Sequence, residues 1–227
     1  MINKEQIRQY FRAFLLALVI LAVFSLYLFL RRGYFNLLIL NKSIASTSLV
    51  LLGAILLIGP FSRFYNRFDK WLIYRREIGI AAFLLALAHS IISYSGRTSP
   101  ALLWGMISLA ILALLFFTSH KFVESRMSRR FWVEFQSWGI RLGALFAFWH
   151  LTILKYSSWL KWISLERDQK LVLPDLPPAS LIGALFIGFV AITRFAEILG
   201  VKTARKIFEI SFIVLIFAII ALFFLDL

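Results

Sequence analysis

Apolar residues along this chain gather in long runs, separated by short polar or basic segments. Seven of these runs approach or reach the ~20 residues that a helix needs to cross ~30 Å of hydrocarbon. Helix-breaking residues stand at several of their ends: Pro60, Gly96, Pro100, Pro177, Pro178 and Gly200. The pattern predicts membrane spans at about 12–30, 44–60, 79–96, 101–118, 135–154, 178–194 and 206–225.

These spans predict an all-α fold, a polytopic membrane bundle of six to seven transmembrane helices, with residues 1–227 as a single integral membrane domain. The first run is followed by Arg31 and Arg32 without a small-residue cleavage site, which favours a retained helix over a signal peptide. The sixth and seventh spans leave an alternative open. Residues 193–206 also suit a kinked connection along the membrane interface.

The composition agrees with a membrane protein. Hydrophobic residues make up 61% of the chain, charged residues only 16%, and the mean hydropathy is +0.86. A net charge of +14 suggests nucleic acid in a soluble protein, but here the charges form no contiguous basic domain. Lipid bilayer is therefore the expected partner and nucleic acid is not. The absence of cysteine excludes disulfides, thiolate metal sites, c-type heme attachment and iron–sulfur clusters.

Lysine and arginine are distributed unequally between the predicted spans. Sixteen lie in segments on one side of the membrane and eight on the other, with Arg141 inside a span. The positive-inside rule then predicts a multi-pass protein of the plasma or inner membrane with a cytoplasmic N-terminus and an external C-terminus. The polar insert 157–178 carries Trp159 and Trp162, and we expect it to lie along the outer surface as an aromatic anchor. Docking of a partner is the alternative.

Two histidines lie deep in apolar runs, His89 in the third predicted span and His150 in the fifth. An ionisable side chain within a membrane normally has a partner or a function. Both spans run outward, and His89 lies ~10 Å before Gly96 while His150 lies ~8 Å before Lys155. Two neutral imidazoles at one depth on neighbouring helices are able to ligate one heme iron between them.

Small residues share a helix face with each histidine. Their spacing is three to four residues. On the third span they are Gly79, Ala82, Ala86 and Ser93, and on the fifth Gly139, Gly143 and Ala147. Such faces leave room either for a flat macrocycle or for close helix contact, because small residues three apart are ordinary membrane packing motifs. Heme ligation and hydrogen-bonded structural histidines both remain open at this point.

The sequence gives weaker support for a role of four other ionisable residues in heme binding. Arg97 and Lys155, just outside the two histidines, could pair with heme propionates or simply extend to the interface. His120, at the inner end of the fourth span, is interpreted as a solvated residue at the wrong depth to join the site. Arg141 lies nine residues before His150, on the opposite side of that helix, and is expected to reach towards the cytoplasmic face.

The sequence contains no recognisable catalytic motif. It lacks a Gly-rich phosphate loop, paired carboxylates, a zinc-binding His-Glu-x-x-His helix and a Gly-x-Ser-x-Gly elbow. The acidic residues lie near helix ends, which argues against a proton-coupled transporter with a buried carboxylate. We therefore predict no catalytic side chain, and enzymatic activity is left open.

Two stretches of sequence resemble a known family. Residues 75–79, Arg-Arg-Glu-Ile-Gly, followed by 86–89, Ala-Leu-Ala-His, resemble the third-helix signature of the ferric reductase-like transmembrane domain family. Thr118-Ser119 and then 129–132, Arg-Arg-Phe-Trp, leading into the helix of His150, resemble its fourth loop and fifth helix. The likeness is nearest to its short bacterial branch, the heme-binding membrane subunit of the periplasmic methionine-sulfoxide reductase system.

This resemblance extends over about 49–200, which leaves spans 12–30 and 206–225 as extra helices. It implies six core helices, b-type heme and transmembrane electron transfer, with His89 and His150 at the heme-iron ligand positions.

The sequence departs from the family at an inner site. The family usually has another histidine near the inner start of the fifth helix, where this chain has Gln136 and Ser137. Likewise, Leu102 and Leu103 stand 13–14 residues after His89. One heme b is therefore expected, and a second heme is in doubt.

The chain ends at Leu227, directly after the last span, whereas flavin and nicotinamide domains need roughly 100–150 residues each. We therefore expect electrons to come from a quinol or a separate flavoprotein, so that any quinone or flavin belongs to a partner. They would pass to an acceptor on the outer face, such as an external redox partner protein. The alternative is a non-enzymatic membrane scaffold or partner subunit that retains the fold without electron transfer.

Overall fold

The computed structural model describes residues 4–94 and 100–225. Throughout these two ranges the regular structure is helical. The elements are α1 (Lys4–Arg32), α2 (Leu37–Phe64), η1 (Asn66–Tyr74), α3 (Arg75–Ser93), α4 (Pro100–Thr118), α5 (Lys121–Glu124), α6 (Arg129–Ile163), α7 (Ala179–Ala196), η2 (Glu197–Leu199) and α8 (Val201–Phe223). Seven helical segments of the described chain are long and apolar enough to cross a membrane, which confirms the predicted all-α membrane bundle.

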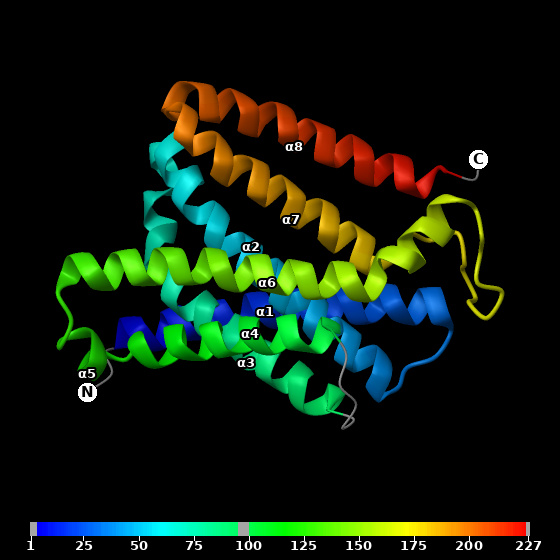
Figure 1. Ribbon diagram of the computed structural model, residues 1–227, viewed down its shortest axis with the longest axis horizontal. Coiled ribbons are helices and arrows are strands. Elements are labelled where there is room, and N and C mark those ends of the chain that lie inside the picture. Colours follow the sequence, from blue (N-terminus) through cyan, green and yellow to red (C-terminus); the bar gives the residue numbers. More distant parts are fainter. Residues whose placement is uncertain (1–3, 95–99, 226–227) are drawn as a thin grey trace.

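The long helices lie side by side and alternate in direction (Figure 1). We call the end where α1 begins the N-terminal end of the bundle, and the end where α1 and α6 finish the far end. Helix α2 is the central element, with 67% of its spanning window buried, and it packs against α1, α3, α6 and α7. Helix α4 packs mainly against α6, and α7 forms an antiparallel pair with α8.

Buried hydroxyl groups are satisfied within this helical framework. Ser43 and Thr47 are fully buried in α2, and each donates to the carbonyl four residues earlier, at 3.0 and 2.8 Å. Ser48 donates across to the carbonyl of Ala82 in α3 at 2.8 Å. Ser108 of α4 bonds the carbonyl of Gly143 in α6 at the same distance. Such bonds let polar side chains stabilise helix contacts where water is absent.

Of the residues predicted to end helices, one lies inside a helix and another does separate two helices. Pro60 lies inside α2, which continues to Phe64, so the predicted end at this residue is wrong. The missing N–H frees only one carbonyl, close to the helix end, and a transmembrane helix tolerates this where neighbouring elements pack against it. Gly200 does separate two helices, with a φ of +87° that suits glycine, so α7 and α8 form a hairpin in place of the kinked interfacial connection. Gly96 lies outside the described residues.

The predicted aromatic anchor in the 157–178 insert is also wrong. Helix α6 continues to Ile163, and this extension turns Trp159 and Trp162 towards α7, where they are only 7% and 3% exposed. The indole of Trp159 donates to Ser180 at 2.9 Å. The indole of Trp162 donates to the carbonyl of Pro174 at 3.2 Å. These side chains belong to the protein core and not to the lipid interface.

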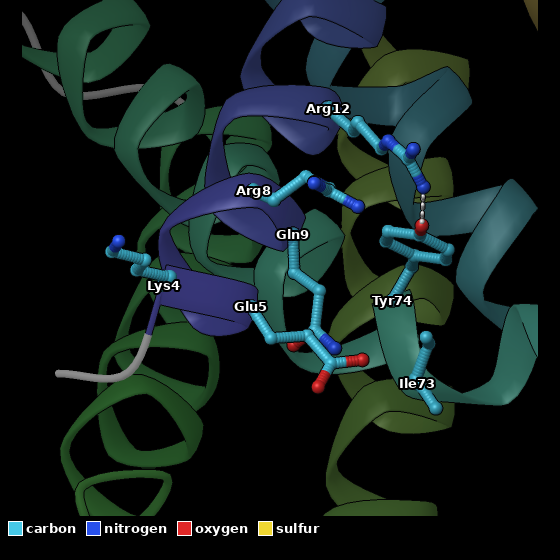
Figure 2. A pocket seen from close by; sticks show the side chains of 7 residues that line it. All are labelled: Lys4, Glu5, Arg8, Gln9, Arg12, Ile73 and Tyr74. Atoms are coloured by element: carbon cyan, nitrogen blue, oxygen red, sulfur yellow. Dashed lines mark hydrogen bonds between the residues drawn. The ribbon is translucent and has the colours of Figure 1, made fainter.

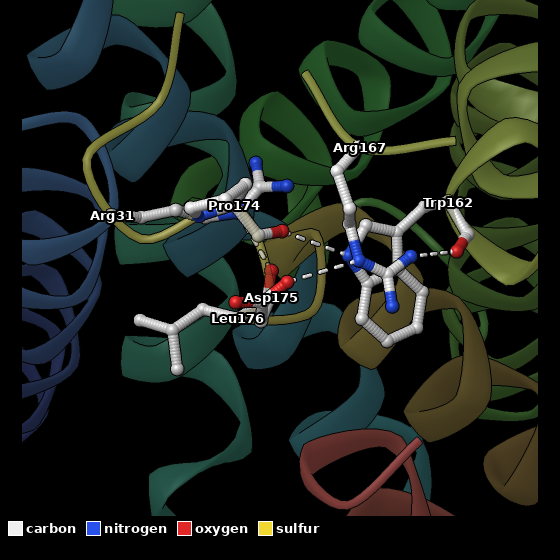
Figure 3. Close-up of polar contacts among 6 residues, drawn as sticks. All are labelled: Arg31, Trp162, Arg167, Pro174, Asp175 and Leu176. Carbon is white, nitrogen blue, oxygen red and sulfur yellow. Dashed lines mark hydrogen bonds and ion pairs between the residues drawn. The ribbon is translucent and has the colours of Figure 1, made fainter. Parts of the chain in front are cut away.

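Charged side chains hold the rest of this insert across the far end of the bundle (Figure 3). Arg167 forms an ion pair with Asp175 at 3.3 Å and donates to the carbonyl of Trp162. Arg31, at the end of α1, donates to the carbonyl of Leu176 at 2.8 Å. The insert is thereby tied to both α1 and α6.

Candidate functional site

His89 projects from the last turns of α3 and is oriented by a residue of α2. Its Nδ1 lies 2.9 Å from the amide oxygen of Asn41, which is buried. The amide nitrogen of Asn41 donates in turn to the hydroxyl of Ser93 at 2.8 Å, one helical turn beyond His89. Because an amide oxygen only accepts hydrogen bonds, Nδ1 carries the proton and Nε2 keeps its lone pair.

His150 has the same arrangement on α6, with a backbone group as its partner. Its Nδ1 lies 2.6 Å from the carbonyl oxygen of Ala101 in the first turn of α4. The ring rests on Gly105, where an added Cβ would come within 2.9 Å of Nδ1. The carbonyl again fixes the proton on Nδ1 and leaves the lone pair on Nε2.

The two imidazoles are brought together from two separate helix pairs. His89 stands on the α2–α3 pair and His150 on the α4–α6 pair, and both side chains are half-buried. They lie close enough to interact electrostatically. Within residues 4–94 and 100–225, neither Nε2 atom has a hydrogen-bond partner. The described part of the site therefore offers two imidazole lone pairs that no other described side chain uses.

This arrangement fits axial ligation of a heme iron. Metal-binding histidines usually donate their other ring N–H to a carbonyl or carboxylate, which fixes the tautomer and the ring plane. Both histidines satisfy that condition. The described residues contain no cluster of three or more His, Cys, Asp or Glu side chains that could hold a bare metal ion. Two histidines suit instead an iron whose other four ligands come from a porphyrin.

The small-residue faces serve helix contact in this structure. Gly139 and Gly143 face α4, where an added Cβ would come within 2.5 and 3.2 Å of leucine side chains. Gly79 faces α2, where an added Cβ would lie 3.8 Å from the side chain of Ile55. The backbone of Ala82 accepts the bond from Ser48 of that helix. Of the two roles considered for these faces, close packing is therefore the one that the glycines fill.

Cationic side chains gather next to the histidines at the far end of the bundle. Lys155, expected from the sequence, is half-buried on α6, whereas Arg97 lies outside the described residues. Lys42, next to Asn41, and Arg32 lie close enough to Lys155 to interact electrostatically. The buried Nε of Arg32 has no hydrogen-bond partner in the described chain. Lys42, Arg32 and Lys155 could therefore hold the two carboxylates of a heme.

Sequence reasoning missed Asn41 and Lys42, which both lie before the predicted start of the second span. The available signal was a pair of polar residues, Asn41-Lys42, at the edge of an apolar run. The structure places them inside α2, which begins at Leu37.

The inner candidates do not join the two histidines. His120 is exposed and precedes α5 at the N-terminal end of the bundle. The amide nitrogen of Gln136 donates to the hydroxyl of Thr118 at 2.9 Å and to the carbonyl of Leu115 at 3.2 Å. It therefore ties the start of α6 to the end of α4. Ser137 is half-buried beside it.

A separate hollow lies between the start of α1 and the end of η1 (Figure 2). Its volume is about 400 Å³, and Arg12 donates across it to the hydroxyl of Tyr74 at 2.7 Å. The lining residues are Lys4, Glu5, Arg8, Gln9, Arg12, Ile73 and Tyr74. Because these side chains belong to the N-terminal end of the bundle, the hollow is distinct from the histidine site.

A comparison with known families agrees with the motifs in the sequence. Residues 43–146 match the family model described as ferric reductase like transmembrane component. The match begins in α2, includes His89, and ends in α6 four residues before His150. The resemblance inferred from the third and fifth predicted helices is thereby confirmed.

Proposed function

Because residues 43–146 match the family model of a ferric reductase like transmembrane component, we propose that this protein binds one b-type heme between His89 and His150 and relays electrons within the membrane. One observation carries the proposal. Each histidine donates its Nδ1 proton to a fixed oxygen, that of Asn41 at 2.9 Å for His89 and that of Ala101 at 2.6 Å for His150, and this leaves Nε2 free. When bound, the heme supplies one-electron redox chemistry.

The protein's own residues supply ligation, orientation and charge balance. The amide oxygen of Asn41 and the carbonyl of Ala101 hold the two rings and increase the basicity of Nε2. Lys42, Arg32 and Lys155 offer positive charge for the propionates at the far end. The surrounding apolar helices exclude water.

The distribution of basic residues supports a cytoplasmic N-terminus and an external C-terminus in the plasma or inner membrane. In that orientation the two histidines lie in the outer half of the bilayer. Arg75 begins α3, and His89 follows 14 residues later, about 21 Å along the helix. A donor that reaches the heme from within the membrane, such as a quinol, suits this depth better than a cytoplasmic flavoprotein. The acceptor would be a redox partner at the outer face.

A membrane scaffold without electron transfer is the second candidate. The observation that favours it is Gln136, which stands where the family usually has an inner histidine and whose amide is bonded to α4. Without a histidine at this position, α6 offers no imidazole there for a second heme, which would be the next electron carrier towards the cytoplasmic side.

A visible absorption spectrum separates the two functions. The full-length protein, expressed with ample heme and purified in detergent, is expected to show a reducible low-spin b-type spectrum, because two neutral imidazoles give a strong axial field. A colourless wild-type protein would favour the scaffold and exclude the heme relay.

A further inference from the structure

Four arginines from four different helices converge at the N-terminal end of the bundle. They are Arg63 of α2, Arg75 of α3, Arg141 of α6 and Arg194 of α7. Arg75 and Arg194 each lie close enough to Arg63 and Arg141 to interact with them electrostatically. We call these four residues the arginine cluster. It is separate from the histidine site, because Arg75 and His89 are about 21 Å apart along α3.

One carboxylate serves this cluster. Glu197, in η2, forms ion pairs with Arg63 at 2.9 Å and with Arg194 at 2.6 Å. It is also the one carboxylate among the main charges that act on Arg75 and Arg194 in the described chain. Arg75 and Arg141 have no carboxylate partner within the described residues. Glu197 therefore pairs with two of the four guanidinium groups and acts electrostatically on a third, Arg75.

Three members of the cluster are shielded from bulk water, whereas Arg63 at its edge is 66% exposed, and the shielded part is incompletely hydrogen-bonded. The side chain of Arg194 is 16% exposed, and Arg75 and Arg141 are half-buried. The Nε atoms of Arg194 and Arg141 are buried and have no hydrogen-bond partner in the described chain. Gly59 of α2 lies beneath Arg194, where an added Cβ would be 3.5 Å from its Nη1. Buried, unpaired donors of like charge are costly unless an anion neutralises them.

We propose that the arginine cluster binds a phosphate-bearing anion, either the headgroup of an anionic phospholipid or a soluble phosphate compound. Guanidinium groups present forked donors that match phosphate oxygens, and two buried Nε donors here lack acceptors. The cluster lies where α2 and α7 end and α3 begins, at the level where lipid headgroups meet helix ends. This site does not depend on heme binding.

Thermal unfolding of the full-length protein tests the proposal with two probes. One is inorganic phosphate, titrated into detergent-solubilised protein against sodium chloride of equal ionic strength. The other is phosphatidylglycerol in nanodiscs, compared with phosphatidylcholine alone. A rise in the unfolding midpoint with phosphate identifies a soluble ligand, and a rise with phosphatidylglycerol only identifies a lipid headgroup. If neither probe raises the midpoint, the proposal is overturned.

Variants locate the effect. The double variant Arg75→Gln/Arg141→Gln is expected to weaken binding of the active probe by about tenfold or more, since charge-assisted bonds are lost. Without the probe, its midpoint should equal or exceed that of the wild type, because repulsion is relieved. The matched control Arg129→Gln/Arg130→Gln removes the same charge from the same end, where Arg130 is 91% exposed, and should keep the full response.

Glu197→Gln provides a second measurement if the double variant does not fold. Removing the shared carboxylate should lower the midpoint without the probe and enlarge the rise on adding it. A smaller rise in this variant, or equal loss of response in the control, would show that general surface charge and not the arginine cluster binds the anion.

Discussion

The amide oxygen of Asn41 on α2 accepts a hydrogen bond from Nδ1 of His89 on α3 at 2.9 Å. The amide nitrogen of Asn41 donates a hydrogen bond to the hydroxyl of Ser93 at 2.8 Å, and this bond sets the orientation of the amide. A residue near the start of one helix thereby determines which imidazole nitrogen is free on another. This hydrogen bond supports His89 as a heme ligand more strongly than its position in an apolar run does alone.

The first prediction concerns the two ligands. His89→Ala and His150→Ala should each abolish or shift the reducible b-type spectrum, because loss of one imidazole removes an axial ligand. His120→Ala should leave the spectrum unchanged, since that side chain is exposed at the start of α5. Absorption spectra of the oxidised and reduced proteins provide the measurement. An unaltered spectrum in either of the first two variants would exclude that histidine as a ligand.

The second prediction concerns Asn41. Asn41→Ala should keep a b-type spectrum but weaken heme retention by about 10–100-fold, the usual cost of losing a bond that orients a ligand. Heme transfer to apomyoglobin measures this loss. Asn36→Ala is the matched control, because the Asn36 side chain caps α2 at 3.0 Å from the amide of Ile39 and does not touch the histidine. That change should cost about 1 kcal/mol of stability without affecting heme retention. Equal heme loss in both variants would contradict the role of Asn41.

The third prediction concerns the surface on which His150 rests. Gly105→Ala would place a Cβ within 2.9 Å of Nδ1, so the ring must shift and the spectrum should change or disappear. Gly188→Ala is the control, because its added Cβ meets nothing within 4 Å. Glycine in a helix interior is less favourable than alanine by roughly 0.5–1 kcal/mol, so the control should be stabilised and keep its spectrum. Identical spectra for both variants would show that Gly105 does not position the ring.

The sequence predicts the helices well because each span is a long apolar run, whose length the bilayer sets. It predicts their ends less well. Pro60 does not end α2, since the freed carbonyl is tolerated near a helix end, and α6 extends nine residues beyond the predicted 154 to Ile163. That extension buries Trp159 and Trp162. In the sequence alone, these two residues lie among aromatic and polar neighbours, as an interfacial anchor would.

The site is predictable only in part. His89 and His150 are conspicuous because ionisable residues are rare in apolar runs. Their hydrogen-bond partners are not, because Asn41 is 48 residues from His89 and the partner of His150 is a backbone carbonyl 49 residues away. The arginine cluster is equally hidden. Its four members are ordinary basic residues near span ends, and only the packing of α2, α3, α6 and α7 brings them together.

The fourth prediction concerns topology. Reporters fused after Leu227 and after Arg97 should be external, and one inserted near Arg129 should be cytoplasmic. The reason is the sixteen-to-eight bias of basic residues, together with seven helical segments able to span the membrane. Alkaline phosphatase and green fluorescent protein fusions report the two sides. A cytoplasmic C-terminus with an external Arg97 would contradict a spanning role for one of the last two helices and leave the histidine site unaffected.

The fifth prediction is one heme per chain. The inner position of α6 carries Gln136, whose amide nitrogen is already bonded to α4 at 2.9 and 3.2 Å, and Ser137, which is a poor iron ligand. Gln136→His would introduce an imidazole at that position without changing the outer pair. Pyridine hemochrome analysis against protein concentration should give a ratio near one for the wild type. A ratio near two would mean that another residue, with His120 the first to test, completes an inner site, and electrons would then have a shorter path from the cytoplasmic side.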